Sequence, residues 1–366
     1  SSYLTASIST NEAHGDKQAT LNTPPNDQLR WEKTTSWDLG FDFSVFSHRL
    51  TGSFDVYHKK SSDVLAQIDL DPTTGWSSLY TNNAQTLNKG MELQLSAEIL
   101  TARTRSQVRV SMDFTLAYNK NKILKLYHEP TSGWSALGSY HEGDPINSLY
   151  SFAFDHVETD EDGYQQLYWR AADGSTYCND LYTTTFKVED VKFSGSLDPK
   201  WSGSIMPVIT WQGFSLGASF VWYAGHYFRA DAQRWDTDIS LSYEASVPRS
   251  YLDYWRKPES ERSGVLGNGY MMNYMNVSIY DLKYCDQNVD HADYMKLRSL
   301  TLGYKFTPEI CRFIGVGGMS IRLQMNNVCT WVRNNRGIDP ERVEASSGTL
   351  GNKIPKSYTV SLNVNI

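Results

Sequence analysis

The sequence has no apolar run that approaches the roughly 18 residues of a transmembrane helix, which argues against a helical membrane protein. It has no excess of basic residues either: the formal net charge is −7, which argues against a nucleic-acid binder. The four cysteines share no C-x-x-C spacing and the eight histidines form no H-E-x-x-H motif, so we expect no metal and no cofactor. The opening stretch SSYLTASIST lacks the basic and apolar segments of a signal peptide, so we expect any targeting segment upstream of Ser1.

Aromatic residues are abundant instead, at 13% of the chain, and many of them alternate with polar residues. The stretch SWDLGFDFSVFSHRLTGSFDVYHKK, residues 36–60, shows this period of two on both sides of Ser47-His48. Such alternation is typical of a β-hairpin with one apolar face and one polar face. The mean hydropathy of −0.48 does not exclude a membrane protein, because apolar and polar residues average out in the strands of a transmembrane barrel.

Ten segments carry this pattern, some of them less cleanly, and we predict that each is a strand. Most are about 9–13 residues long, whereas strands of soluble proteins usually have about 5–6 residues. A tilted strand needs about 9–11 residues to cross a bilayer, so the lengths favour a transmembrane antiparallel β-barrel. The predicted strands are 3–9, 36–46, 49–60, 89–100, 107–118, 204–211, 213–223, 298–306, 318–326 and 356–366.

The connections between these segments differ in size. Transmembrane barrels have short periplasmic turns and long extracellular loops. We therefore expect the long connections outside the cell, with Cys311 near the periplasm and the other three cysteines outside. Residues 147–170 also resemble two strands and a turn, which we assign to a hairpin within a long loop. The short connections are Ser47-His48, 101–106, Gln212 and 307–317, and the long ones are about 61–88, 121–201, 224–294 and 328–355.

Two short motifs suggest chemistry, and both have a simpler explanation. GFSLG, residues 213–217, matches the G-x-S-x-G pattern, but Ser215 lies within a continuing strand and not at a strand-to-helix turn. ETDEDG, residues 158–163, resembles the start of a calcium loop, yet Trp169 stands where the bidentate Glu belongs. We interpret the first as ordinary strand and the second as a solvated acidic turn.

The candidate binding residues lie in two of the long loops and at the ends of the adjoining strands. Residues 220–238 mix aromatic rings with charged groups, which is a combination suited to sugars or peptides. An aromatic girdle at the membrane surface, followed by a loop that packs on itself, would have the same composition. The candidates are Trp134, Tyr168, Trp169, Trp222, Tyr223, Tyr227, Arg229, Asp231 and Trp235.

Several longer stretches resemble one known family when their order and spacing are taken together. Among them are LRWEKTTSWDLGFDFSVFSHRLTGSFDVYHKKSSDVL, NNAQTLNKGMELQLSAEI, DPKWSGS, DYMKLRSLTLGY, LQMNNVCTW, NNRGIDPE and the closing SYTVSLNVNI. These are similar to the SusC/RagA-like family of TonB-dependent outer-membrane transporters. One departure is the final residue, which is Ile366 where the family usually has Phe.

The resemblance implies a 22-stranded barrel filled by an N-terminal plug, of which this chain would supply about the C-terminal ten strands. It implies a SusD-like surface lipoprotein on the outer loops, energy from the TonB complex through the plug, and uptake of oligosaccharides or oligopeptides. The plug and the first dozen strands are not in this chain, so the N-terminal part of the same transporter is a further expected partner. No enzymatic activity is implied.

We therefore interpret residues 1–366 as one domain, the C-terminal part of an outer-membrane barrel. The alternatives are a soluble β-sandwich that binds glycans and an outer-membrane enzyme that uses Ser215. In the barrel, Asp38, Asp42, Ser53 and Asp55 are expected to face a wet, plug-filled lumen. The residues of the same hairpin expected to face lipid are Trp37, Leu39, Phe41, Phe43, Val45, Leu50, Phe54 and Val56.

Overall fold

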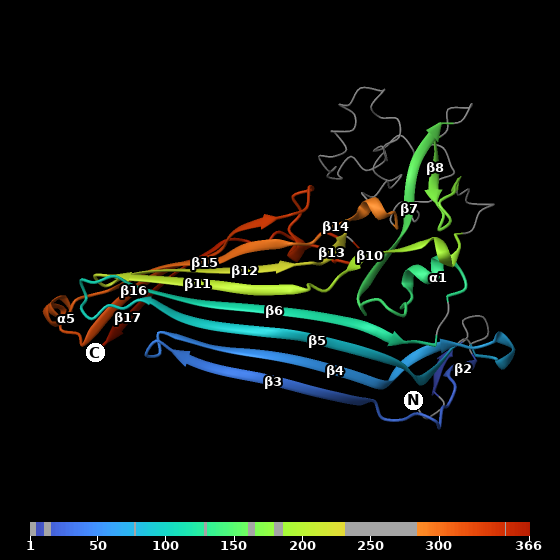
Figure 1. Cartoon of the computed structure of the whole chain (residues 1–366), viewed down its shortest axis with the longest axis horizontal. Coiled ribbons are helices and arrows are strands. Elements are labelled where there is room, and N and C mark those ends of the chain that lie inside the picture. The colour runs from blue at the N-terminus through green and yellow to red at the C-terminus, as the bar shows by residue number, and fades with distance from the viewer. Residues whose placement is uncertain are drawn as a thin grey trace.

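The computed structural model describes residues 5–10, 16–76, 78–127, 130–159, 165–178, 186–230, 284–347 and 349–366. Nine strands form one antiparallel sheet in the order β17-β16-β15-β12-β11-β6-β5-β4-β3. They run side by side along the molecule, with tight turns at one end and larger connections at the other (Figure 1). The strands are β3 (Lys33–Val45), β4 (Leu50–Asp69), β5 (Ser78–Leu100), β6 (Arg109–Lys125), β11 (Trp201–Trp211), β12 (Phe214–Ala224), β15 (Tyr294–Lys305), β16 (Gly318–Val332) and β17 (Ser357–Asn365).

The two faces of this sheet differ in chemistry, as the alternation predicted. One row of opposed residues on adjacent strands is Leu39, Val56, Met91, Tyr118 and Trp201, all of them large and apolar or aromatic. The apolar face is open over much of its area: Leu39 is 70% exposed and Leu362, at the far edge, is 60% exposed. An apolar surface of this extent needs a non-aqueous neighbour, and in a transmembrane barrel that neighbour is lipid.

A β-sandwich is excluded by the same observation. Two packed sheets would bury their apolar faces against each other across about 10 Å. Here the long strands belong to one sheet, and its apolar face is covered by no second sheet of the described residues. The alternative of a soluble glycan-binding sandwich is therefore wrong.

The strands are tilted as a barrel requires. Val45, the last residue of β3, lies in a row of opposed residues that reaches Pro207 on β11, four strands away. β11 ends four residues later, at Trp211 (207 to 211). Four residues correspond to about 13 Å along a strand, and four strand spacings correspond to about 19 Å across the sheet. The ratio of these two lengths gives a tilt of the strands to the barrel axis of about 35°. Transmembrane barrels have tilts of about 35–45°, so the turns at this end share one depth.

Aromatic residues mark the two edges of the apolar band. Trp201 and Trp211 stand at the two ends of β11 and on the same face. Ten residue steps at a tilt of about 35° span about 27 Å along the barrel axis, close to the apolar band of about 25 Å in known barrels. Tyr118 contacts Trp201 at one edge, and Phe214 contacts Tyr304 at the other. These rings have the position of the aromatic girdles at the two membrane surfaces.

Tight turns join the strands at one end, close to the predicted positions. The β11–β12 turn has Gln212 at φ 50° and Gly213 at φ 92°, the two positive values of a type I′ turn. The β3–β4 turn has positive φ at Phe46, Ser47 and His48. Between β15 and β16 the connection is a short helix, α5 (Pro308–Ile314).

Two predictions about the wall are corrected. The segment 3–9 is not a wall strand: β1 (Thr5–Thr10) pairs with β2 (Lys17–Thr23) in a separate sheet, because six residues are too few to cross the membrane. Among the described residues the wall therefore has nine strands, and β3 starts at the end where the large connections lie. Most of residues 61–88 is strand and not loop, since β4 and β5 stay paired as far as Asp69 and Ser78.

The remaining elements gather at the end opposite the tight turns, as Figure 1 shows. The hairpin predicted within 147–170 is confirmed as part of a separate sheet of order β10-β7-β8-β9. No described helix is long and apolar enough to cross a membrane. The elements at this end are η1 (Pro72–Thr74), α1 (Gly133–Gly138), β7 (Ser148–Thr159), β8 (Gln165–Arg170), β9 (Thr176–Cys178), η2 (Val188–Asp190), β10 (Val191–Ser196), β13 (Tyr227–Arg229), η4 (Asp286–Asn288), β14 (Val289–His291) and η5 (Pro340–Arg342).

Candidate functional site

The candidate site is the outer end of the barrel, where three connections pack together. We call the assembly of α1, β7 to β10, η2, β13, η4, β14 and η5 the outer cap. Its first part has an aromatic core of Phe152, Phe154, Trp169 and Phe186, which packs with Cys285 of the second connection, and each of the five is at most 7% exposed. The rings of Phe152 and Phe186 are stacked with their centroids 3.6 Å apart, and Trp169 meets Phe186 edge-on at 5.4 Å. This core gives the cap a fixed shape of its own.

Arg229 joins the second connection to the first. Its side chain is 2% exposed and donates hydrogen bonds to the carbonyl oxygen of Tyr150 at 2.6 Å and to Ser151 Oγ at 3.2 Å. The guanidinium also lies 5.0 Å from the ring centroid of Tyr284, a cation–π contact. Burial lowers the pKa of Arg229 to about 10, so it stays charged at neutral pH. The residue therefore bridges β13 and β7 inside the cap.

The third connection is held by ionic and apolar contacts. Lys296, 3% exposed on β15, lies 3.1 Å from Asp339 Oδ2 and 2.5 Å from Glu341 Oε2. Arg298 pairs with Glu341 as well, and Tyr294 donates a hydrogen bond of 2.8 Å to the same carboxylate. A buried cation is tolerated because these carboxylates compensate its charge.

An apolar cluster supports the same connection from the other side. Phe228 in β13 and Ala230 directly after it pack with Ala292, and Ile338 and Val343 of the third connection lie against them. The backbone N–H of Arg229 also donates to the carbonyl oxygen of Ala345 at 2.8 Å. Residues 333–345 are thus fixed to β13 and β15 and cover part of the outer end of the wall.

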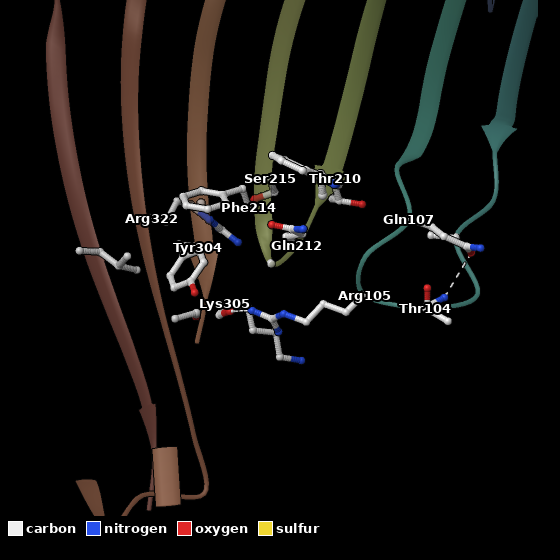
Figure 2. Close-up of a pocket in the computed structure, with 16 residues that line it drawn as sticks. Thr104, Arg105, Gln107, Thr210, Gln212, Phe214, Ser215, Tyr304, Lys305 and Arg322 are labelled. Atoms are coloured by element: carbon white, nitrogen blue, oxygen red, sulfur yellow. Dashed lines mark hydrogen bonds between the residues drawn. The ribbon is translucent and has the colours of Figure 1, made fainter. Parts of the chain in front are cut away.

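Below the cap, the lumen face of the wall is polar. Asp55 on β4 lies directly opposite Glu92 on β5, and Thr115 on β6 lies 2.8 Å from Ser204 on β11 through their hydroxyl oxygens. A cavity of about 440 Å³ at the tight-turn end is lined by Arg105, Lys305 and Arg322 among others, as Figure 2 shows. The lumen face therefore offers charges and hydroxyl groups to a hydrated occupant.

Ser215 lines that cavity and has no catalytic surroundings. It lies on the continuing strand β12, opposite Gly303 of β15. The cavity lining contains neither a histidine nor a carboxylate that could act as its base. Among the described residues, no group of three or more His, Cys, Asp or Glu side chains could hold a metal ion. Within the described residues, nothing suggests bond-making or bond-breaking chemistry at this end.

The predicted site residues of the first long loop fall into different environments. Trp169 is 1% exposed and belongs to the aromatic core of the cap. Trp134, on α1, is 37% exposed and meets Phe152 and Phe186 edge-on. Tyr168 is half-buried, with its ring stacked on His156 at 4.7 Å. Trp134 and Tyr168 therefore remain accessible to a ligand, and Trp169 does not.

The candidates near β12 separate in the same way. Trp222 lies on the apolar outer face, with its ring across Gly203, so its position is that of a girdle residue. Tyr223 lies on the lumen face, where its ring stacks on Tyr294 at 5.2 Å. Tyr227 contacts His291 at 4.8 Å in the cap. Asp231 and Trp235 lie outside the described residues.

Sequence reasoning missed the group that holds the third connection. Lys296 meets Asp339 and Glu341, which lie 43 and 45 residues further along the chain. The stretch NNRGIDPE contains both carboxylates. Its letters indicate the family resemblance but do not reveal the ionic group. Lys296 itself looks like a polar residue at a strand end, so its partners could not be deduced from the pattern.

Comparisons with known proteins agree with this architecture. The family model for the TonB dependent receptor-like β-barrel matches residues 3–328. The chain is 24% identical over 371 residues to the TonB-dependent receptor SusC of Bacteroides thetaiotaomicron, covering 96% of this chain and 34% of SusC. It is 26% identical to the TonB-dependent receptor P3 of Formosa agariphila, covering 89% of this chain and 32% of P3. The chain thus spans about a third of the length of these relatives.

A solved structure shows the same fold. The RagAB peptide transporter aligns over 98% of this chain and 38% of its own, with a TM-score of 0.71 and 20% sequence identity. The alignment includes the outer connections as well as the wall, because nearly the whole chain is covered. This chain therefore belongs to the TonB-dependent receptor-like β-barrel family of the bacterial outer membrane, and it is similar to the SusC/RagA-like members of that family.

Proposed function

We propose that this chain is the C-terminal part of an active importer that takes up oligosaccharides or oligopeptides. In this proposal a SusD-like surface lipoprotein docks on the outer cap, and the TonB complex supplies energy through a plug in the lumen. The observation that best supports this proposal is that the wall has a polar lumen face and an apolar outer face, and that its described residues form a packed cap at the end opposite the tight turns. The cap residues Trp134, Tyr168 and Tyr227, with Tyr223 below them, are the proposed substrate contacts.

The two proposed substrate classes, oligosaccharides and oligopeptides, need different contacts. Aromatic rings with neighbouring hydrogen-bonding groups suit sugars, whereas a lumen wall with paired carboxylates such as Asp55 and Glu92 suits the amide and amine groups of peptides. The relative named as a peptide transporter supports the peptide class. Oligosaccharides are the second proposed class, because the aromatic rings of Trp134 and Tyr168 stay accessible in the outer cap.

Uptake by whole cells tests the proposal. Cells that produce the complete transporter receive fluorescent oligosaccharides or oligopeptides, and cells lacking its gene are the control. We expect uptake of one class only, and its loss when a protonophore collapses the inner-membrane gradient. Uptake that persists without the gradient would contradict the active mechanism.

Co-purification tests the partner separately. An affinity tag placed in the β5–β6 turn, at Thr104, is far from the outer cap. We expect a surface lipoprotein to be recovered in equal amount with the tagged barrel after gentle detergent extraction. Recovery of the barrel alone under conditions that preserve uptake would exclude a stable lipoprotein partner.

A further inference from the structure

The helix α5 turns its apolar side chains away from the protein. Ile310, Phe313 and Ile314 follow the i, i+3, i+4 spacing that places residues on one side of a helix. They are 39%, 93% and 53% exposed, whereas Cys311, on another side of the helix, is 3% exposed. A surface helix normally directs such a stripe at a core, so this one needs an apolar neighbour outside the described residues.

The orientation of α5 is fixed by the backbone around it. The helix ends at Gly315, whose φ of 82° lies in the left-handed region that favours glycine. The N–H of Val316 then donates to the carbonyl oxygen of Cys311 at 2.9 Å, and the N–H of Gly317 donates to the carbonyl oxygen of Asn365 on β17 at 2.7 Å. The exposed stripe is therefore a consequence of how the connection is built.

The depth of α5 identifies the neighbour. The helix begins two residues after Phe306, whose ring meets Tyr304 edge-on at 5.0 Å. Tyr304 also contacts Phe214, so these rings belong to the girdle at the tight-turn end. Aromatic girdles lie at the level of the lipid headgroups. Since α5 follows the girdle directly, its apolar stripe lies at the depth of the headgroups, where the apolar neighbour available to it is lipid.

We propose that α5 is an interfacial anchor, with Ile310, Phe313 and Ile314 inserted into the periplasmic leaflet of the outer membrane. Helices of this kind lie in the membrane surface with their apolar side about 5–10 Å into the headgroup and acyl region. Glu309 and Arg312 are exposed on a polar side of the helix, which stays in water. The anchor fixes the β15–β16 connection at the membrane surface whichever cargo the barrel carries.

Photo-crosslinking tests this site directly. The complete transporter carries benzoylphenylalanine at position 313, 310 or 312 and is reconstituted in vesicles of phosphatidylethanolamine and phosphatidylglycerol. At position 313 the introduced residue replaces Phe313, which is also aromatic and apolar. Adducts are counted only in protein that shows the heat-modifiable gel migration of an assembled barrel. We expect lipid adducts at positions 310 and 313, several-fold more than at position 312, which is the matched control on the polar side.

Two results would overturn the proposal. A protein adduct at position 313, within the polypeptide or to another chain, would show that the stripe docks on a protein surface. Equal or absent lipid adducts at 313 and 312 would show that the stripe is in water. If the variant at 313 does not assemble, the variant at 310 decides the question by the same criteria.

Discussion

At the scale of single residues, the adjacent pair Trp222 and Tyr223 shows how the pleat of a strand separates two roles. Trp222 faces outward across Gly203, and Tyr223 faces the lumen next to Tyr294. We predict that Tyr223→Ala lowers uptake about two- to tenfold, the worth of one aromatic contact of about 0.5–1.5 kcal/mol. Trp222→Ala is the matched control, and we expect it to leave the uptake rate per assembled barrel unchanged. A larger loss of uptake in the Trp222 variant would reverse the two roles.

The cost of a charge depends on both face and depth. Phe43 lies two residues before the end of β3, so Leu39 is nearer than Phe43 to the middle of the apolar band. We predict that Leu39→Arg destabilises the folded barrel by about 2–4 kcal/mol and Phe43→Arg by about 0–1 kcal/mol. Asp38→Arg, on the lumen face, serves as the control, and we expect little loss from it. Urea unfolding in lipid vesicles measures all three, and equal losses for Leu39 and Asp38 would contradict the assigned faces.

At the scale of elements, η5 and its neighbours are held to the wall by a carboxylate that must be ionised. Burial alone would raise the pKa of Glu341, but hydrogen bonds from Lys296 and Tyr294 and the charges of Lys296 and Arg298 lower it overall. A carboxylate with a lowered pKa stabilises the folded state above its unfolded pKa of about 4.3, and this stabilisation disappears as the pH falls through the folded value.

We therefore predict that residues 333–345 loosen below about pH 4 while the wall persists. Glu341→Gln should loosen them at neutral pH, by about 1.5–3 kcal/mol for lost charged hydrogen bonds. Hydrogen–deuterium exchange, corrected for the intrinsic effect of pH, measures both. Glu344→Gln is the control, because Glu344 is exposed and bonds only Ser347 among the described side chains. If residues 333–345 exchanged equally fast in the two variants, the ionic contacts of Glu341 would not be what holds them to the wall.

The aromatic core of the outer cap should unfold separately from the wall. Trp169 is 1% exposed and surrounded by Phe152, Phe154 and Phe186. We predict that Trp169→Ala destabilises the cap by about 3–5 kcal/mol. Limited proteolysis should then cut within residues 133–196 while the barrel keeps its heat-modifiable migration. Tyr140→Ala, at a site 56% exposed, is the control and should leave the cleavage pattern unchanged.

At the scale of the whole molecule, the wall was predictable from the sequence apart from the segment 3–9, whereas only the β7–β8 hairpin of the cap was. Period-two alternation, as in residues 36–60, predicts a strand whose two faces meet different surroundings. The length of the strands then indicates that they cross a membrane. The cap is held by contacts between residues far apart, such as Arg229 with Tyr150, which no local period encodes. Aromatic residues were the weakest guide, because Trp169, Trp222 and Trp134 occupy a core, a girdle and a surface.

The topology of the molecule gives one further prediction. Thr104 lies in the exposed connection between β5 and β6 at the tight-turn end, and Ala172 lies in the exposed turn between β8 and β9 of the outer cap. We predict that a membrane-impermeant thiol reagent labels Ala172→Cys on intact cells and labels Thr104→Cys only after the outer membrane is opened. Cys311 is a poorer reporter of the same side, because it is 3% exposed and would react slowly wherever it lay. Labelling of both introduced cysteines on intact cells at similar rates would show that the two ends of the wall are not separated by a membrane, since an apolar band of about 25 Å excludes the reagent.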